Sequence, residues 1–285
     1  MKRLALGLFA AVLCAVQPVS AQSESESAAA PHERMIAVEG GRNFRDVGGY
    51  RTADGRQVRW ARLYRSGSLG SVTSAGMIRL EHLQTRAIID LRMTDERRRD
   101  PNNWLSLSGL GYWTRDYRLG GDQGSLAQVF ADPAKLTADR VRMAMIAGYR
   151  TMPKELAPQY RELFKQLLHP APGAVVVNCT AGKDRTGIAS ALVLTALGVP
   201  YNTIREDFLL SNAGLNMASL QGTLSPEVAR LPPEVAKPLV GVEGEYLDAA
   251  FDQLNRDYGS VEAYLDKELG IGPILIAALK RQMLN

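Results

Sequence analysis

A cysteine and an arginine lie six positions apart near the middle of the chain, in the run Asn178-Cys179-Thr180-Ala181-Gly182-Lys183-Asp184-Arg185-Thr186-Gly187. The residues between them are small or polar. A thiolate is a strong nucleophile, and the planar guanidinium carries a permanent charge that matches two oxygens of a phosphate. The residue types and their spacing therefore predict attack by sulfur on a phosphoryl group.

The flanking segments predict how this loop is held. The apolar run Gly173–Val177 precedes it and the apolar stretch Ile188–Leu197 follows, which is typical of a buried strand, a tight loop and a helix. The N–H groups of such a loop can turn inward as an anion site that the positive end of the helix faces, and the same field favours a thiolate. The predicted phosphate-binding residues are Thr180, Ala181, Gly182, Lys183, Asp184 and Arg185.

Each part of the loop also has a simpler interpretation. A single cysteine at a strand end is often a small buried hydrophobe, and an arginine in the first turn of a helix is often a solvated charge. A loop of this kind could also bind an oxyanion without turning it over. Cys179 and Arg185 together on one loop are less common than either alone, and the combination favours catalysis.

The first residues predict a secretion signal. Met1-Lys2-Arg3 precede the apolar run Leu4–Val16, and Val19-Ser20-Ala21 supply the small residues that a signal peptidase reads. The apolar run is too short to span a bilayer comfortably. We therefore expect a signal peptide over 1–21, export to the periplasm or out of the cell, and no stable membrane anchor.

Removal of this signal changes the cysteine count. The chain has two cysteines, and Cys14 lies within the signal, so only Cys179 remains. A single cysteine forms no internal disulfide. Because a free thiol in an oxidising compartment is open to oxidation, we expect activity that is sensitive to oxidants.

Composition makes several classes of protein poor candidates. Hydrophobic residues make up 46% of the chain and charged residues 22%, which is ordinary for a globular domain. The net charge of +4 includes Lys2 and Arg3 of the signal, and no basic stripe with interleaved aromatic residues occurs, so nucleic acid is not an expected partner. His32, His82 and His169 lack metal-ligand spacing, and we expect neither a metal nor a cofactor.

Beyond the signal, the sequence predicts one domain. The polar segment 22–35 is expected to be a disordered spacer, and 36–285 to form a single α/β domain with a helix-rich C-terminal half. Phe44–Arg65 carries turn signals between short strands. The proline-containing segment 212–242 is either a lid over the site or a long connection.

Within this domain, hydrophobic periodicity predicts the elements. Strands are expected at Ala87–Leu91, Tyr112–Leu119 and Gly173–Val177. Helices are expected at Ser74–Gln84, Thr137–Tyr149, Lys154–Leu168, Ile188–Leu197, Asn202–Leu210, Glu243–Tyr258, Val261–Leu269 and Ile274–Met283.

Four motifs carry a family resemblance. They are Asn43-Phe44-Arg45-Asp46-Val47-Gly48-Gly49-Tyr50, Leu63-Tyr64-Arg65-Ser66-Gly67, Ile88-Ile89-Asp90-Leu91-Arg92 and Ala181-Gly182-Lys183-Asp184-Arg185-Thr186-Gly187, supported by Asp207–Asn212 and Tyr264-Leu265. From about residue 36 to the C-terminus the chain resembles the Cys-x5-Arg phosphatases, in the bacterial branch called tyrosine phosphatase family three. The resemblance implies a protein-tyrosine-phosphatase-like central sheet flanked by helices, and dephosphorylation through a phosphocysteine without a metal.

The resemblance also implies roles in the loop. Cys179 attacks phosphorus in line, and Arg185 with the N–H groups of Thr180 to Arg185 binds the equatorial oxygens. Thr186 offers its hydroxyl to the cysteine sulfur, caps the helix, or does both. Asn178 departs from the pattern, because the family usually has histidine there. Asparagine carries no charge, so we expect a less populated thiolate and reduced but retained activity.

The leaving oxygen needs a proton. The Trp-Pro-Asp tripeptide that supplies it in many tyrosine phosphatases does not occur in this chain. In the family that the chain resembles, the aspartate within the loop is thought to be the acid, and Asp184 corresponds to it. Alternatively Asp184 caps the helix or balances Lys183, and Asp116 is then the second candidate for the acid.

Other motif residues keep two interpretations. Lys183 is either a second cation for the phosphate, as in phosphatases that accept phosphoinositides, or a solvated surface charge. Arg45 and Asp46 lie near the catalytic loop by resemblance, or belong to a hairpin and an ion pair. Asp90 and Arg92 are expected to be structural.

These expectations lead to one function and two alternatives. We expect an exported, cysteine-dependent tyrosine phosphatase, with phosphoserine, phosphothreonine or phosphoinositides as candidate further substrates. A rhodanese-like sulfurtransferase also places cysteine on a strand-to-helix loop, but sulfur carriage needs no arginine six positions later. A non-catalytic phosphate-binding module fits less well with an intact set of Cys179, Arg185 and Thr186.

Overall fold

The computed structural model describes residues 32–102, 110–120, 129–132, 135–215, 228 and 230–285. The expected signal peptide over 1–21 and most of the expected spacer over 22–35 lie outside the described residues. The chain divides into the units Met1–His32 and Glu33–Asn285, and every element below belongs to the second unit.

Five strands form one sheet in the order β1-β2-β5-β3-β4. The strands are β1 (Arg45–Asp46), β2 (Leu63–Ser66), β3 (Thr85–Asp90), β4 (Gly111–Thr114) and β5 (Ala174–Asn178). Only β1 and β2 pair antiparallel, and the other neighbours are parallel. The central strand β5 is buried along its whole length, which explains its unbroken apolar sequence.

Most of the helices follow β5 in the chain, as expected. Within the described ranges they are α1 (Ser74–His82), α2 (Thr94–Arg99), α5 (Ala138–Glu155), α6 (Ala157–Leu168), α7 (Arg185–Leu197), α8 (Tyr201–Leu209), α9 (Ser211–Gly214), α11 (Pro233–Val240), α12 (Gly244–Tyr258), α13 (Val261–Lys267) and α14 (Pro273–Met283). The mixed α/β architecture with a helix-rich C-terminal half is therefore confirmed. Across these ranges, every helix is too short or too polar to cross a bilayer.

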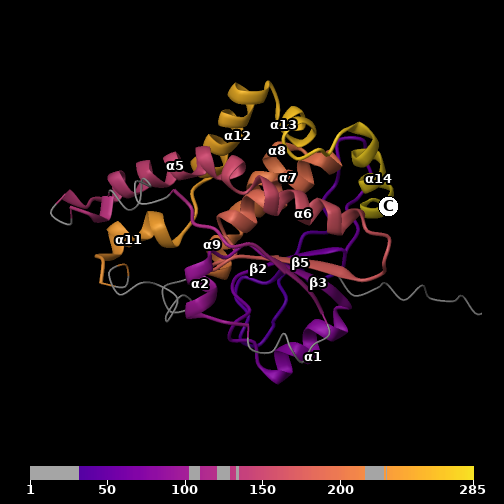
Figure 1. Ribbon diagram of the computed structural model, residues 1–285, viewed down its shortest axis with the longest axis horizontal. Coiled ribbons are helices and arrows are strands. Elements are labelled where there is room, and N and C mark those ends of the chain that lie inside the picture. The colour runs from indigo at the N-terminus through magenta and orange to yellow at the C-terminus, as the bar shows by residue number, and fades with distance from the viewer. Residues whose placement is uncertain (1–31, 103–109, 121–128, 133–134, 216–227, 229) are drawn as a thin grey trace, which may run out of the picture. The chain divides into compact units, whose positions relative to one another are not determined.

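Apolar side chains leave the sheet on alternating sides, because successive residues of a strand point to opposite faces. One set joins a cluster with Leu80 of α1 and comprises Tyr64, Ile88, Ala174 and Val176. The alternate set joins the larger cluster that includes α6 and α7 and comprises Leu63, Ile89, Val175 and Val177. Figure 1 shows α1 on one face of the sheet and α6 and α7 on the other.

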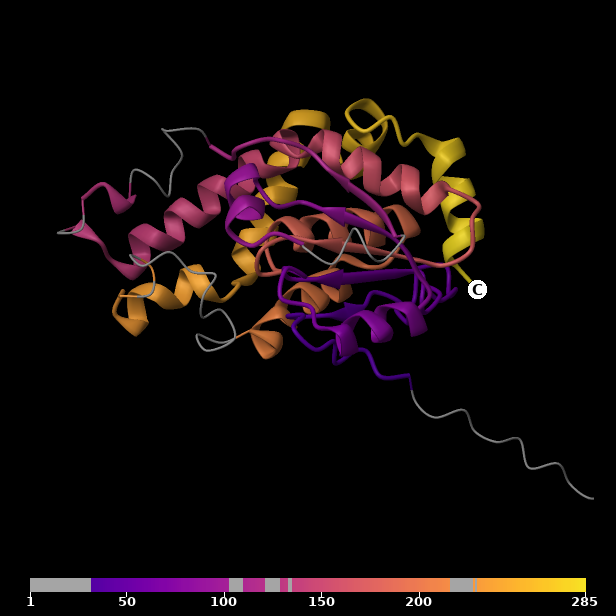
Figure 2. The ribbon, with the colours of Figure 1, turned by 60° about the horizontal axis from the view of Figure 1, so that its bottom comes forward.

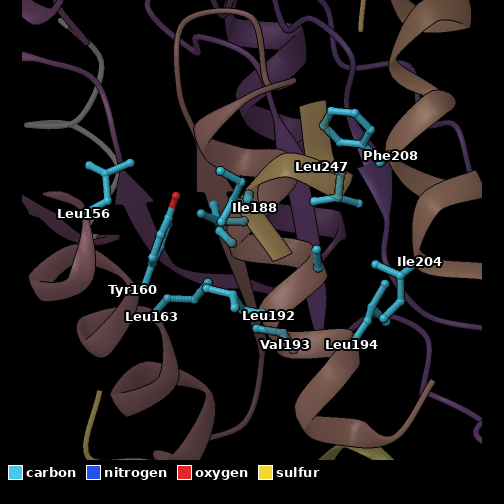
Figure 3. Close-up of a cluster of buried hydrophobic side chains, with 14 of the residues drawn as sticks. Leu156, Tyr160, Leu163, Ile188, Leu192, Val193, Leu194, Ile204, Phe208 and Leu247 are labelled. Carbon is cyan, nitrogen blue, oxygen red and sulfur yellow. The ribbon is translucent and has the colours of Figure 1, made fainter. Parts of the chain in front are cut away.

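Helix α7 is enclosed by its neighbours. All but one of its 13 residues are buried, as expected for a helix that is apolar on every side. Tyr160 and Leu163 of α6 pack against one side of it, and Ile204 and Phe208 of α8 against the other (Figure 3). This packing fixes the start of the helix, and with it the position of Arg185.

Helix α5 packs against both α11 and α12, and the two ribbon views show the three helices together (Figures 1 and 2). An ion pair of 2.6 Å joins Arg142 of α5 to Glu243, the residue before α12. Through this packing, α5 brings the hydroxyl of Tyr149 to Asp184 in the loop after β5.

Several boundaries differ from the predicted ones. The helix expected at Thr137–Tyr149 continues to Glu155, with Pro153 within its last turn. The strand expected at Tyr112–Leu119 ends at Thr114. The segment 212–242 holds the end of α9 and all of α11, but 216–227 and 229 lie outside the described residues, so its expected role as a lid or a connection stays a prediction.

The ordered contacts also begin earlier than the expected boundary at residue 36. Met35 forms an antiparallel bridge with Arg45, and the N–H of Ile36 donates to the carbonyl of Phe44 at 3.0 Å. The guanidinium of Arg34 lies 3.9 Å from the centre of the Tyr50 ring. Residues 34–36 therefore extend the edge of the sheet beyond β1.

Candidate active site

The loop between β5 and α7 lies at the carboxyl edge of the sheet. Ser66, Asn178 and Asp90 end three neighbouring parallel strands and lie side by side in register. Cys179 follows Asn178, and Arg185 begins α7. Ligands of open parallel sheets bind at this edge, where strand ends and helix N-termini meet. The structure therefore places the predicted loop where an anion site is expected.

Four successive carbonyl oxygens of the loop accept hydrogen bonds from Ser68, Asn43 and Arg65. The bonds run from Ser68 N to Thr180 O at 2.9 Å, from Asn43 Nδ2 to Ala181 O at 3.3 Å and Gly182 O at 3.1 Å, and from Arg65 Nη2 to Gly182 O at 3.0 Å and Lys183 O at 3.5 Å. Because the C=O and N–H of a planar trans peptide point in opposite directions, the N–H groups of residues 181–184 face away from these donors. None of those four N–H groups has an acceptor within the described part of the chain.

Gly182 allows the loop to turn this tightly. Its φ is +71°, a conformation that residues with a Cβ rarely adopt. A Cβ at this position would also lie 2.4 Å from the backbone nitrogen of Gly67 and from the carbonyl carbon of Ser66. Both the backbone angle and the close approach require glycine.

Cys179 is buried, with 1% of its surface exposed, and its thiol is free. It belongs to the larger apolar cluster, so its burial matches the simpler interpretation given above. It nevertheless lies among polar groups. Burial raises the pKa of Tyr117, Tyr149 and Tyr160, and a negative charge on Cys179 raises each pKa further.

Arg185 is held end-on by Glu96 of α2. Nη1 lies 2.6 Å from Oε2 and Nη2 lies 2.8 Å from Oε1, and about a tenth of each side chain is exposed. Burial alone would raise the pKa of Glu96, but Arg185 lowers it to about 2, so the carboxylate is ionised at neutral pH. Burial would lower the pKa of Arg185, but Glu96 raises it well above its usual value. The interpretation of Arg185 as a solvated charge is therefore wrong.

Beyond the pairing with Glu96, the nitrogens of the guanidinium differ in their hydrogen bonds. Nη1 also donates to the carbonyl of Leu91 at 3.0 Å, and Nη2 donates to the hydroxyl of Thr180 at 3.4 Å. Among the residues that the structure describes, no acceptor binds Nε–H. Arginine holds phosphate through two parallel N–H groups. Nη2 of Arg185 already has Glu96 and, at the longer distance of 3.4 Å, Thr180 as acceptors, so a phosphate that binds the Nε and Nη2 edge would replace Thr180 at Nη2.

Asp184 stands at the N-cap of α7, but its side chain makes no capping hydrogen bond. Its Oδ1 accepts from Lys183 Nζ at 2.8 Å and from the Tyr149 hydroxyl at 2.6 Å. Lys183 is 4% exposed and also donates to the carbonyl of Gly241 at 3.1 Å. The capping interpretation of Asp184 and the surface interpretation of Lys183 are therefore wrong, whereas the expected ion pair between the two residues is present.

Asp116, the second candidate acid, lies apart from the loop. Its side chain is 82% exposed, and its Oδ1 accepts from Arg97 and, at 3.1 Å, from the hydroxyl of Thr94. Across the described ranges, no hydrogen bond joins Asp116 to residues 179–185. Of the two candidates, only Asp184 belongs to the loop itself.

Thr186 is fully buried, and its hydroxyl has no hydrogen-bond partner among the described residues. The expected bond to the sulfur of Cys179 is therefore not formed in this structure. The alternative, a helix cap, is not formed either. The backbone carbonyl of Thr186 accepts instead from the hydroxyl of Ser190 at 2.9 Å.

Asn178 connects the loop to the ion pair of Asp90 and Arg92. Its Nδ2 donates to Asp90 Oδ1 at 3.2 Å, and its own Oδ1 has no partner within the described ranges. Asp90 and Arg92 are 2.7 Å apart and fully or almost fully buried. They support the strand ends, which agrees with the structural role expected of them.

The residues of the first motif divide between the loop and a turn. Arg45 forms an ion pair with Asp207 at 3.4 Å. Asp46 accepts instead from the N–H groups of Gly48 at 2.7 Å and Ala61 at 2.8 Å. Arg45 therefore belongs to the surroundings of the loop, and Asp46 stabilises the connection between β1 and β2.

Three residues that hold the site were not predicted to do so, namely Glu96, Tyr149 and Asp207. Glu96 had a local signal, because acidic residues in the first turn and Arg97–Arg99 in the last are typical of a short helix. Its pairing with Arg185, 89 positions away, has no sequence signal. In the sequence, Tyr149 is part of a predicted helix and Asp207 is part of a supporting motif. Only the packing of α5 and α8 brings them to the loop.

Comparison with known proteins agrees with this geometry. Residues 36–285 match the model of the tyrosine phosphatase family. A protein of Cupriavidus necator named as a tyrosine-protein phosphatase is 34% identical over 236 residues, which cover 80% of this chain and 82% of the relative. The triple specificity protein phosphatase PtpB of Mycobacterium tuberculosis is 30% identical over 275 residues, covering 85% and 96%. A tyrosine-protein phosphatase of Nostoc commune is 28% identical over 222 residues, covering 76% and 72%.

The family model spans the sheet, the loop and the helices that enclose it. The relatives are matched over most of their own length as well as over most of this chain. The chain belongs to the tyrosine phosphatase family.

Proposed function

We propose that this chain is an exported, cysteine-dependent phosphatase that hydrolyses phosphotyrosine through a phosphocysteine intermediate. The observation that carries the proposal is the orientation of the loop, whose carbonyls are bound on one side while its N–H groups face the other. Such a row of donors, ending at Arg185, suits a tetrahedral dianion. Phosphoserine, phosphothreonine and phosphoinositides are candidate further substrates, because one relative is named for triple specificity.

In the first half-reaction, the sulfur of Cys179 attacks phosphorus. A sulfur–phosphorus bond forms as the bond to the leaving oxygen breaks. The N–H groups of residues 181–184 and the Nε and Nη2 edge of Arg185 bind the three non-bridging oxygens. Asp184 donates a proton to the leaving oxygen, and it does so from Oδ2, because Oδ1 accepts from Lys183 and Tyr149.

In the second half-reaction, water attacks the phosphocysteine. Asp184 takes a proton from the water, the sulfur–phosphorus bond breaks, and inorganic phosphate leaves with the thiolate restored. The unpaired, buried hydroxyl of Thr186 is the group that would donate to the departing sulfur. Peptide N–H groups and a guanidinium supply the positive charge, so neither step needs a metal or a cofactor.

A Cys179→Ser variant tests the mechanism. Because a hydroxyl is a far weaker nucleophile than a thiolate, we expect hydrolysis of p-nitrophenyl phosphate and of phosphotyrosine peptides to fall by at least about 10⁴-fold, while tungstate still binds. In the wild type, acid quenching followed by mass spectrometry should find one phosphoryl group on Cys179. Retained turnover in the variant would exclude phosphocysteine chemistry.

The same assays separate the alternatives. Formation of thiocyanate from thiosulfate and cyanide would favour a sulfurtransferase, and oxyanion binding without any turnover would favour a non-catalytic module. A panel of phosphopeptides and inositol phosphates, assayed with the wild type, would rank the substrate classes.

We propose export on the basis of the segment 1–21, which lies outside the described residues. Expression of the full chain in a bacterial host should give a protein whose first residue is Gln22, recovered from the periplasm or the medium. A cytoplasmic protein that retains Met1 would contradict export while leaving the phosphatase proposal intact.

A further inference from the structure

Two buried arginines share one carboxylate behind the loop. Arg65 Nη1 lies 2.6 Å from Asp207 Oδ2, and Arg45 Nε lies 3.4 Å from Asp207 Oδ1. Both arginines are 0% exposed and Asp207 is 2% exposed. Arg45 and Arg65 are partners in the pairing of β1 with β2, and Asp207 comes from α8. Three elements therefore meet at this carboxylate, which also accepts from the hydroxyl of Tyr50 at 2.9 Å.

This cluster reaches the loop through two side chains. Arg65 Nη2 and Asn43 Nδ2 donate to the carbonyls of residues 181–183, and both bind the middle one, at 3.0 Å and 3.1 Å. Arg45 Nη1 in turn holds Asn43 by donating to its Oδ1 at 2.6 Å. The orientation of three consecutive peptide units is therefore set by Arg65 and Asn43, and the N–H end of each unit points to the opposite side.

The cluster also carries charge. Burial would raise the pKa of Asp207, but Arg45 and then Arg65 lower it to about 2, so the carboxylate stays ionised. Burial, followed by the neighbouring Arg65, lowers the pKa of Arg45 to about 10, and the guanidinium is still protonated at neutral pH. Two guanidinium groups and one carboxylate leave one net positive charge. In a buried site such a charge polarises the hydrogen bonds next to it.

We propose that Arg65 and Asn43, locked by Asp207 and Arg45, are positioning residues that direct the loop N–H groups at a bound oxyanion and strengthen them as donors. The consequence for turnover rests on the proposed phosphatase function, whereas the consequence for oxyanion binding does not. A purely structural role, in which the cluster only ties α8 to the sheet, would change stability without changing the affinity for an oxyanion.

An Arg65→Lys variant of the full chain tests the proposal. Lysine keeps the charge but has no fork, so it cannot bind Asp207 and the loop carbonyls together. We expect the tungstate dissociation constant, measured by titration calorimetry, to rise about tenfold, and kcat/KM on p-nitrophenyl phosphate to fall about 100-fold. Thermal unfolding is measured on the same samples.

Arg86→Lys is the matched control. Arg86 also donates through Nη2 to a backbone carbonyl, that of Gln166, and it too has an unpaired Nε, but it lies on β3 away from the loop. We expect its tungstate affinity and kcat/KM to stay within about twofold of the wild type. An Arg65→Lys variant that loses stability yet binds tungstate as tightly as the wild type would overturn the proposal.

A second variant covers the case in which Arg65→Lys does not fold. Asn43 has a φ of 50°, so Asn43→Gly keeps the backbone conformation and removes both donated hydrogen bonds. We expect its tungstate dissociation constant to rise about fivefold. An unchanged constant would overturn the proposal.

The outcomes separate this inference from the proposed function. A wild type that binds tungstate, with weaker binding in both variants but no phosphatase turnover, would support the positioning role and contradict the function. A wild type that hydrolyses phosphotyrosine, with variants that bind tungstate and turn over substrate as well as the wild type does, would support the phosphatase function and contradict the positioning role.

Discussion

Asp184 accepts two hydrogen bonds on one carboxylate oxygen and, within the described residues, none on the other. Lys183 and Tyr149 thereby fix the plane of the carboxylate and leave Oδ2 as the oxygen that can carry a proton. Burial, and then Asp184, raises the pKa of Tyr149 well above its usual value, so its hydroxyl remains a donor at physiological pH. At the scale of single residues, Tyr149 is a positioning residue for the proposed acid.

Replacing the acid should affect substrates unequally. In Asp184→Asn we expect kcat on alkyl phosphates such as phosphoserine peptides to fall by about 10²–10³-fold. The loss on p-nitrophenyl phosphate should be about tenfold or less, because its leaving group needs little protonation. The measurement is kcat across a series of leaving groups.

The control for this prediction is Asp116→Asn, which should leave every substrate within about twofold of the wild type because Asp116 is exposed and outside the loop. Equal losses on alkyl and aryl phosphates in Asp184→Asn would remove Asp184 from the acid role. A leaving-group bias in Asp116→Asn would transfer the role to that residue.

Tyr149→Phe should show the same bias toward alkyl phosphates with a smaller loss, about five- to tenfold, since the acid remains but one of its two donors is gone. The measurement is again kcat across the leaving-group series, compared with thermal unfolding of the same variant. A uniform loss on all substrates would mean that the tyrosine only supports the fold.

Helix α2 has six residues, and its contribution to the site depends on one side chain. The carboxylate of Glu96 accepts from the N–H of Met93 and the hydroxyl of Thr180, both at 2.6 Å, in addition to Arg185. It therefore caps α2 at Met93 and joins this helix to the loop and to the start of α7. At the scale of elements, this carboxylate holds the guanidinium in place before any phosphate binds.

The lowered pKa of Glu96 predicts a dependence of stability on pH. The pKa in the folded protein is about 2 against an ordinary 4.5, so the ionised carboxylate stabilises the fold above its ordinary pKa, and this contribution is lost as the pH falls toward 2. In Glu96→Gln we expect the free energy of unfolding at pH 7 to fall by about 3 kcal/mol. Urea unfolding from pH 7 downward should show the difference between variant and wild type narrowing below about pH 4.5.

The control is Glu234→Gln, which removes an exposed carboxylate from the first turn of α11 and should change the free energy of unfolding by less than about 1 kcal/mol. A Glu96→Gln difference that stays constant with pH would show that the ion pair is not its source.

The sequence predicts best those elements whose structure depends on their own residues and not on distant partners. β5 and α7 are mostly apolar, and the turn between them carries its own glycine, so the strand, the loop and the helix that hold Cys179 and Arg185 are predictable as elements. α2 is short and wholly polar, and its position depends on an ion pair with a residue 89 positions away. The hydrogen-bond partners of Lys183 and Asp184 also cannot be predicted from the sequence, because Gly241 and Tyr149 come from distant segments.

At the scale of the whole molecule, the positive charge offered to a phosphate comes from peptide N–H groups, Arg185 and the net charge of the Arg45–Asp207–Arg65 cluster. Among the described residues, no group of three or more His, Cys, Asp or Glu side chains lies together as metal ligands would. The chemistry proposed above draws its positive charge from the peptide N–H groups and the arginines named here.

Dialysis of the full chain against a chelator such as EDTA should accordingly leave kcat and KM on p-nitrophenyl phosphate within about twofold, and added magnesium or manganese should not raise them. A control phosphatase that requires two metal ions, treated in parallel, would show that the chelation was effective. Activity that disappears on dialysis and returns with a divalent metal would contradict the mechanism.

Main-chain amides, unlike side chains, cannot be exchanged by substitution, and they recognise only the three terminal oxygens that every phosphate monoester shares. The alcohol to which the phosphate is attached must then be distinguished by residues outside the turn from Thr180 to Asp184. Relatives with the same turn can thus diverge in preference, and vanadate, arsenate or sulfate should compete with each substrate of this enzyme to the same extent.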